Sequence, residues 1–301
     1  MGKESNYLGS VFLLTGSIFS SGFYLASYHY APTASQIFFI STIALAALGL
    51  VKILNHVAHA LPRSLNRTVC WLHSITFETM AIGISFLMRP FLFLGGFNKT
   101  CGPAKGRPVL LIHGYLQNAT NWAILKRRLC QKGFGPVYTL NLTHPFRSIR
   151  AYADAVAKKA DAIAKENQRE DLTLIGHSMG GLVSAWYAAK VAKPGKVSDV
   201  ITIGSPMGGT RLAAIAIGPN GREMRRGSEF VRHLQEEFRH NKKVRFYHIA
   251  SKADQIVHPY RSALTGLHPE REYVIDDIGH MSLLYSSRVA NKIEEWLSPT
   301  R

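Results

Sequence analysis

The sequence has few cysteines, few acidic residues and no charge at all in a long stretch near its start. Its 301 residues contain 3 cysteines, and 19 acidic residues stand against 36 lysines and arginines, which leaves a net charge of +17. Cys70, Cys101 and Cys130 do not have the spacing of a metal site. Their odd number favours a reducing compartment over a set of disulfides.

The uncharged stretch lies between Glu4 and Lys52. It divides around "HYAPTASQ" into two apolar segments, Tyr7 to Tyr28 and Ile37 to Leu54, each near the length that spans a bilayer. A signal peptide is an alternative for the first segment, but a strongly basic start is missing and a second apolar segment follows at once. The pattern therefore predicts two transmembrane helices.

A third apolar region, Val69 to Gly95, is interrupted by polar residues and proline. Glu78 would be costly at the centre of a bilayer, and Pro90 would break a spanning helix. We expect an interfacial or third apolar helix here, and a buried core helix is the alternative. Residues 1–95 are thus predicted to anchor the chain in a membrane, and residues 96–301 to form a second domain.

One serine, Ser178, is flanked by glycines in "TLIGHSMGGLVSAWYAA". The strand-like run Leu172 to Ile175 precedes it and a helix-like run follows. On a very tight strand-to-helix turn, side chains at the positions of Gly176 and Gly180 would collide with backbone. Such a turn presents the serine oxygen at the carboxyl end of a sheet, near a helix N-terminus that favours negative charge. A lone G-x-S-x-G can also be a simple packing turn, so its partners must decide.

A weakly nucleophilic serine needs a histidine base and a carboxylate that orients this base. His280 and Asp254 each lie in a loop just beyond a strand-like run. The two runs are Tyr273 to Ile275 and Val244 to Ile249. Asp276 and Asp277 are nearer to His280 in sequence, but acids in a short loop more often form turns. We therefore predict Asp254 as the orienting acid.

Donors for an oxyanion are expected after the buried strand Val109 to Ile112. His113 and Gly114 follow this strand, and His113 is interpreted as a residue that shapes the loop. The backbone N–H groups of Tyr115 and Met179 are the predicted donors, because one follows the His-Gly turn and the other follows the nucleophile.

From about Pro108 to its end, the chain resembles an α/β-hydrolase, and within that fold the compact lipases and esterases. The order Ser178, Asp254, His280 agrees with the chain order of the fold, and "TIGSPMGGT", Thr202 to Thr210, resembles the stretch after the sixth strand of such lipases. The resemblance implies an α/β fold with a mostly parallel sheet flanked by helices, here preceded by membrane helices. No large lid insertion is evident.

These features predict a membrane-anchored serine hydrolase that cleaves carboxylic esters, in particular lipid acyl esters, through an acyl-enzyme on Ser178. His280 acts as the base and Asp254 holds it in the right tautomer. No cofactor and no metal are expected. The alternatives are an acyltransferase or thioesterase with the same triad, and a catalytically silent module that binds a membrane.

Charge and hydrophobicity extend this hypothesis to the membrane. Basic residues cluster in Arg222 to Phe246 without a nucleic-acid motif, so acidic lipid headgroups are the expected partner, and a solvated basic face is the alternative. Lys52 lies near the end of the second apolar segment, and Arg63 and Arg67 follow it. These basic residues predict a multi-pass protein with its catalytic domain on the cytoplasmic face. The apolar stretch Arg211 to Gly221 is expected to border the mouth of the site and contact acyl chains. An ordinary packed helix is the alternative for that stretch.

Overall fold

The computed structural model describes residues 66–88, 99–103, 106–241 and 243–298. The two predicted transmembrane segments, Tyr7 to Tyr28 and Ile37 to Leu54, lie outside the described residues. Among the helices of the described part, none combines the length and the apolar character needed to cross a bilayer.

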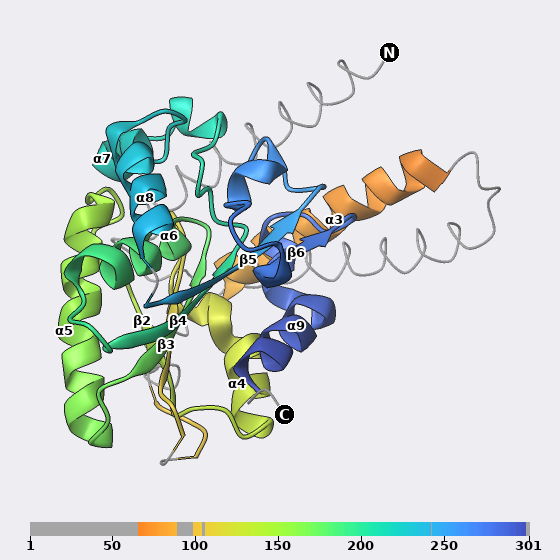
Figure 1. Cartoon of the computed structure of the whole chain (residues 1–301). Helices are drawn as coiled ribbons and strands as arrows, with labels where there is room; N and C mark the ends of the chain where they lie inside the picture. The colour runs from red at the N-terminus through yellow and green to blue at the C-terminus, as the bar shows by residue number, and fades with distance from the viewer. Residues whose placement is uncertain (1–65, 89–98, 104–105, 242, 299–301) are drawn as a thin grey trace.

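Six parallel strands form one sheet in the order β2-β1-β3-β4-β5-β6 (Figure 1). The strands are β1 (Val109–Ile112), β2 (Val137–Leu140), β3 (Leu172–His177), β4 (Val197–Ile203), β5 (Arg245–Ser251) and β6 (Glu272–Ile275). All residues of β1 and β3 are buried. Parallel strands of this kind are rich in Val, Ile and Leu because helices cover both faces of the sheet. The mostly parallel sheet that the sequence predicted is present.

Helices lie on both faces of the sheet (Figure 1). One face is covered by α5 (Ile149–Asn167), α6 (Met179–Trp186) and α8 (Glu229–His240), and the other by α3 (Asn66–Leu87), α4 (Ala123–Gln131) and α9 (Ser287–Leu297). Along β1, Leu110 and Ile112 belong to the first hydrophobic core, and Val109 and Leu111 belong to the second. This alternation follows from the two-residue period of a strand.

Shorter helices fill the connections. They are η4 (Ala119–Trp122), η5 (Tyr187–Val191), η6 (Leu212–Ala214), α7 (Gly218–Glu223), η7 (Tyr260–Ala263), η8 (Pro269–Arg271) and η9 (Met281–Tyr285). Two separate helices, η9 and α9, follow His280. The side chain of Ser286 accepts a hydrogen bond from the N–H of Val289 and so begins α9 as a separate helix.

The order of the strands fixes where loops converge. The chain passes from β2 across β1 to β3, so connections diverge at the carboxyl ends of β1 and β3, where ligands bind in open α/β sheets. Ile112 of β1 pairs with Gly176 of β3, which places the loop that begins at His113 beside the turn at Ser178. Because all strands are parallel, the loops after β5 and β6 leave at the same edge.

The third apolar region contains α3, and this helix packs on the core beside α4 and α9 (Figure 1). Ala81 is 3% exposed and Glu78 is 2% exposed. Among the described side chains of α3, Glu78, Ala81 and Ser85 are buried and Thr79 is exposed, so this helix meets the core along one face. The interfacial or third apolar helix expected in this region stays a prediction. Burial of the Glu78 carboxylate is tolerated because it accepts hydrogen bonds from the backbone N–H groups of Met281 and Ser282.

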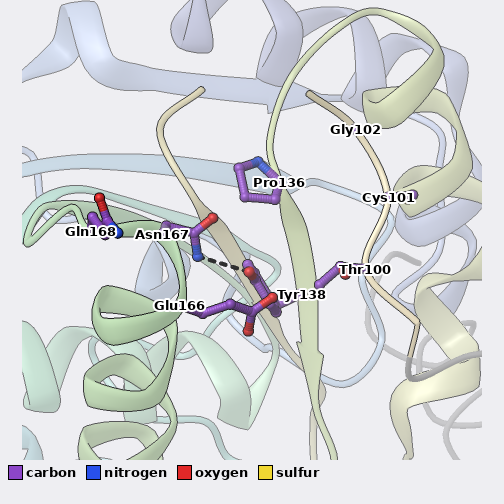
Figure 2. A pocket seen from close by; sticks show the side chains of 8 residues that line it. All are labelled: Thr100, Cys101, Gly102, Pro136, Tyr138, Glu166, Asn167 and Gln168. Carbon is purple, nitrogen blue, oxygen red and sulfur yellow. Dashed lines mark hydrogen bonds between the residues drawn. The ribbon is translucent and has the colours of Figure 1, made fainter. Parts of the chain in front are cut away.

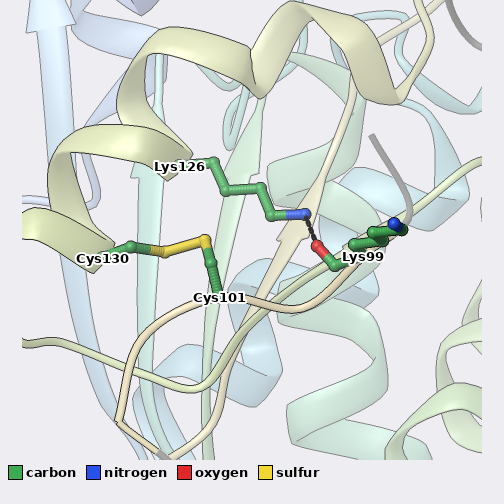
Figure 3. Close-up of a disulfide and its surroundings, with 4 residues drawn as sticks. All are labelled: Lys99, Cys101, Lys126 and Cys130. Atoms are coloured by element: carbon green, nitrogen blue, oxygen red, sulfur yellow. Dashed lines mark hydrogen bonds between the residues drawn. A yellow bond between two sulfur atoms is a disulfide. The ribbon is translucent and has the colours of Figure 1, made fainter. Parts of the chain in front are cut away.

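A disulfide joins Cys101 to Cys130, with Cα atoms 5.7 Å apart (Figure 3). Cys130 belongs to α4, and on this helix Nζ of Lys126 donates a hydrogen bond of 2.7 Å to the carbonyl oxygen of Lys99. The segment before β1 is thereby attached to α4, and closing a loop of 29 residues stabilises the fold by about 3 to 4 kcal/mol. The expectation of a reducing compartment loses its support, because an odd number of cysteines does not exclude one bridge.

A hollow of about 270 Å³ lies near the amino end of β2 (Figure 2). It is lined in part by Pro136 and Tyr138 at the amino end of β2 and by Glu166 and Asn167 at the end of α5. Nδ2 of Asn167 donates a hydrogen bond of 2.7 Å to the hydroxyl of Tyr138. This hollow is remote from the carboxyl ends of the strands, so it does not belong to the candidate site.

Candidate active site

Ser178 occupies a strained turn between β3 and α6. Its φ of 55° and ψ of −126° lie in a region that residues other than glycine rarely adopt. A Cβ atom on Gly176 would lie 2.4 Å from the carbonyl oxygen of Gly180, and one on Gly180 would lie 2.2 Å from that of Ile112. The N–H of Ser178 donates to the carbonyl oxygen of Ile203 at 2.9 Å, which ties the turn to β4. The two glycines are therefore required for this turn, and the turn holds the serine at the carboxyl end of β3.

Asp254 and His280 form a buried pair. Oδ2 of Asp254 lies 2.8 Å from Nδ1 of His280, and the two residues are 5% and 3% exposed. The other oxygen, Oδ1, accepts hydrogen bonds of 2.8 Å from the backbone N–H groups of Ile256 and Val257. The carboxylate is thus held by three donors, and its orientation toward His280 is fixed.

The surroundings of His280 favour its protonated form. Burial by itself lowers the pKa of His280, but the charge of Asp254, the hydrogen bond from Nδ1 to Asp254 and the charge of Glu78 outweigh burial. The pKa of His280 is raised above its ordinary value as a result. A histidine in this setting binds a proton readily, as a general base must.

Asp276 and Asp277 point to solvent. Asp276 pairs with Lys252 at 2.8 Å and its side chain is 75% exposed, whereas Asp277 pairs with Arg288 at 2.5 Å and is 48% exposed. Of the three aspartates considered from the sequence, the structure places Asp254 against His280.

The turn at Ser178 between β3 and α6, called the elbow below, is in direct contact with the loop that carries His280. The ring of His177 lies 4.6 Å from the ring of His280, and its Nε2 lies 3.1 Å from the backbone oxygen of His280. A Cβ atom on Gly204 would lie 3.2 Å from Oδ2 of Asp254 and 3.3 Å from Nδ1 of His280. Ser178, Asp254 and His280 therefore lie together beyond the carboxyl ends of the parallel strands. In the part of the chain that is described, Ser178 Oγ and His280 are not hydrogen-bonded, and bonds of this kind often tighten only with substrate.

The predicted oxyanion donors flank Ser178. A Cβ atom on Gly114 would lie 2.8 Å from Cβ of Ser178, so the loop that carries Tyr115 approaches the serine closely. Oε1 of Gln117 accepts a hydrogen bond of 2.9 Å from the N–H of Gly114, which holds this loop in place. Met179 is the first residue of α6, where amides have no acceptor within the helix.

His113 is buried behind the same loop. The N–H of Leu142 donates to Nε2 of His113 at 2.8 Å, so Nδ1 carries the proton and donates to the carbonyl oxygen of Gly114 at 2.9 Å. Both ring nitrogens of His113 are bonded to backbone, which suits a residue that shapes the loop.

Two residues that hold these loops, Gln117 and Glu78, were not predicted as part of the site. Gln117 bonds Gly114 and also lies 2.8 Å from Sδ of Met281, measured from its Nε2. The carboxylate of Glu78 accepts hydrogen bonds from the backbone N–H groups of Met281 and Ser282. A single carboxylate within an apolar helix was a signal for Glu78, and it was interpreted only as a cost of membrane insertion.

Residues 107–227 match a family described as the alpha/beta hydrolase fold. The matched region contains Ser178 and the loop at His113, and the parallel sheet has its elbow at the carboxyl end of a central strand. The chain has the α/β-hydrolase fold. Asp254 and His280 lie beyond the matched residues, so their placement rests on the structure itself.

Solved structures share this α/β-hydrolase fold at low identity. The mature form of a Bacillus licheniformis lipase is 14% identical, with a TM-score of 0.58 over 66% of this chain and 94% of that chain. Aspergillus fumigatus lipase B is 21% identical, with a TM-score of 0.52 over 65% of this chain and 52% of that chain. A structure from the carboxylesterases of Nitrososphaera gargenis is 17% identical, with a TM-score of 0.50 over 66% of this chain and 92% of that chain.

No candidate metal site is found in the part of the chain that the structure describes. Among these residues, no group of three or more His, Cys, Asp or Glu side chains is arranged to hold a metal ion.

Proposed function

We propose that this α/β-hydrolase cleaves carboxylic esters through an acyl-enzyme on Ser178. The observation that carries the proposal is the buried pair of Asp254 and His280 at the edge of the sheet where a strained serine is held. Strain of this kind persists only where the surrounding structure enforces it, and it clusters at functional sites.

The first half of the reaction forms the acyl-enzyme. Oγ of Ser178 attacks the ester carbonyl carbon while Nε2 of His280 accepts the hydroxyl proton, and Asp254 stabilises the imidazolium through Nδ1. The carbonyl oxygen becomes an oxyanion that the N–H groups of Tyr115 and Met179 bind. The tetrahedral intermediate collapses when the bond to the alcohol oxygen breaks and Nε2 returns the proton to the leaving alkoxide.

The second half releases the acid. His280 accepts a proton from water as the water oxygen attacks the acyl carbon, and the same two amides bind the second oxyanion. The bond to Ser178 then breaks, and the serine oxygen recovers its proton from His280. Reaction with a fluorophosphonate probe, which labels an activated serine, tests this scheme together with turnover of activated esters.

The acyl group is proposed to be that of a lipid, on the evidence of an exposed apolar segment beside the oxyanion loop. Ile215 and Ile217 are 60% and 67% exposed. The hydroxyl of Tyr115 donates to the backbone oxygen of Ile217 at 2.9 Å and accepts from its N–H at 3.2 Å. The ring of Tyr115 also lies 6.3 Å from that of Phe146. Phe146 lines an open hollow of about 420 Å³ together with His144, Pro145 and Arg147.

Replacing both Ile215 and Ile217 with serine is expected to reduce turnover of long-chain esters more than that of short-chain esters. The reason is that only a long acyl chain extends past Tyr115 onto the exposed segment, where each buried CH₂ contributes about 0.8 kcal/mol. The measurement is kcat/KM across esters of graded acyl length. Ile124 on α4 is 55% exposed and provides a matched control, since Ile124→Ser should leave the chain-length profile unchanged. An equal loss on all chain lengths with a lower Tm would instead indicate that the segment only supports the fold.

Membrane anchoring by the two apolar segments before α3 remains part of the proposal, and the disulfide bears on which side the catalytic domain faces. Basic residues after the second segment predict the cytoplasm. The bond between Cys101 and Cys130 argues for the opposite side, because cytosolic thiols are kept reduced. We therefore place the catalytic domain on the oxidising side of the membrane.

Reporter fusions after Arg301 test this placement. A reporter that is active only after export is expected to be active, and one that is active only in the cytoplasm is expected to be silent. The reverse result would restore the prediction made from the lysines and arginines, without affecting the chemistry proposed at Ser178.

A further inference from the structure

Glu78 of α3 is buried beneath the loop that carries His280. Its Oε1 accepts a hydrogen bond of 2.7 Å from the N–H of Met281. Its Oε2 accepts from both the N–H of Ser282, at 3.1 Å, and the hydroxyl of Ser282, at 3.0 Å. Both carboxylate oxygens therefore bond the two residues that follow His280 in the chain.

The loop is built to admit this carboxylate. A Cβ atom on Gly279 would lie 2.3 Å from Oε2 of Glu78, so any larger residue would push the carboxylate away. Gly279 precedes His280 and the bonded residues follow it. The carboxylate thus contacts the histidine loop on both sides of His280.

A second contact ties the same helix to the oxyanion side of the site. Oγ of Ser85, two turns along α3 from Glu78, lies 3.0 Å from the hydroxyl of Tyr285 at the end of η9. It also accepts a hydrogen bond of 2.6 Å from Nδ2 of Asn121 in η4, the short helix that follows Tyr115 and Gln117. Helix α3 therefore connects the loop of the base with the loop of the oxyanion donors.

Among the residues that the structure describes, three titratable groups face His280: Asp254, His177 and Glu78. Burial and the neighbouring His280 hold the pKa of His177 well below its ordinary value, so His177 is neutral. Burial raises the pKa of Glu78 and the charge of Asp254 adds to this rise, whereas the charge of His280 and the hydrogen bonds from Met281 and Ser282 lower it; the net result is a raised pKa. Because both oxygens of Glu78 accept hydrogen bonds, the ionised form fits this environment.

We propose that Glu78 is a positioning residue for the proposed ester hydrolysis: it fixes the backbone after His280, and its negative charge stabilises the imidazolium that forms when Ser178 loses its proton. It does not touch the substrate. The assignment rests on the function proposed above and adds a second carboxylate, from the helix before the catalytic domain, to the support of the base.

The test is Glu78→Gln in the full chain, with a short-chain activated ester as substrate. We expect kcat to fall by about tenfold to hundredfold, since small misplacements of a catalytic group cost that much, while KM stays near the wild-type value. The acid limb of the pH profile of kcat/KM is expected to move to lower pH. The reason is that loss of the negative charge lowers the pKa of His280, so the neutral base persists into more acidic solution.

Three further variants separate charge from packing. Glu236→Gln removes a carboxylate on the exposed side of α8 and is expected to change neither kcat nor the acid limb. Ser85→Ala removes the contact to Tyr285 without a change in charge, so it is expected to lower Tm and to leave the acid limb in place. Glu78→Asp keeps the charge but shortens the side chain, and is expected to lower kcat with the acid limb at the wild-type position.

The outcomes are distinct. Wild-type kcat in Glu78→Gln, or a lower kcat with an unmoved acid limb, would overturn the proposal. Should Glu78→Gln fail to fold, Glu78→Asp decides: lower kcat at unchanged KM supports positioning, and wild-type kcat rejects it. A wild-type chain that neither reacts with the fluorophosphonate probe nor cleaves esters would reject the proposed function itself.

Discussion

Ser178→Ala is expected to abolish labelling by a fluorophosphonate probe and to lower ester turnover by about 10⁴-fold or more, as nucleophile knockouts do in serine hydrolases. The variant removes the oxygen that attacks the ester and leaves the amides of Tyr115 and Met179 in place. Alanine has a Cβ atom as serine does, so it meets the same strained φ of 55°. The free energy of unfolding should therefore change little, and lost activity can be assigned to chemistry.

Ser184 offers a matched control on the same helix. It is buried and its hydroxyl donates a hydrogen bond of 2.7 Å to the carbonyl oxygen of Gly180. Ser184→Ala is expected to keep both labelling and turnover. If Ser178→Ala retained near wild-type turnover, the mechanism would be wrong; if Ser184 carried the label instead, the nucleophile would be misassigned.

Asp254→Asn is expected to lower kcat by about 10³- to 10⁴-fold, because it imposes the wrong tautomer on His280. The N–H groups of Ile256 and Val257 both donate to the Oδ1 position, so an asparagine must direct its oxygen there. Its NH₂ group then faces Nδ1 of His280 and donates to it. The proton of the neutral imidazole moves to Nε2, which can no longer accept the proton of Ser178.

Asp276→Asn and Asp277→Asn are the comparisons for this variant. Each breaks an exposed ion pair, with Lys252 or Arg288, and such pairs contribute about 0 to 1 kcal/mol. Turnover should stay within about twofold of the wild type, a change typical of surface substitutions. A severe loss in either of these variants, together with a mild loss in Asp254→Asn, would mean that Asp254 is not the triad acid.

Much of the site was predictable because its signals are local. Gly176 and Gly180 on either side of Ser178 indicate a tight turn, and the loop positions of its partners distinguish a nucleophile from a simple packing turn. The loop positions of Asp254 and His280 follow from strand-like runs that end just before them. The predicted runs agree with β5 and β6 to within two residues at each end.

Other features depend on segments far apart in the chain. The stretch Arg211 to Gly221 is apolar in sequence, yet only the structure shows that Ile215 and Ile217 are exposed and that Tyr115 binds the backbone there. Likewise, the count of cysteines was compatible with none or one bridge, and the approach of Cys101 to α4 decided between them.

The sequence by itself determined the elbow at Ser178 and the loops that carry its partners, because turn geometry and strand periodicity are set by neighbouring residues. The α/β architecture was implied by the resemblance to α/β-hydrolases. Only the tertiary structure decided that Asp254 rather than Asp276 or Asp277 contacts His280, since this depends on how β5 and β6 pair. Only the tertiary structure showed that Glu78 of α3 lies against the residues that follow His280. A carboxylate in an apolar helix is costly wherever it lacks partners, and the partners of Glu78 are backbone amides more than two hundred residues away, which no local pattern specifies.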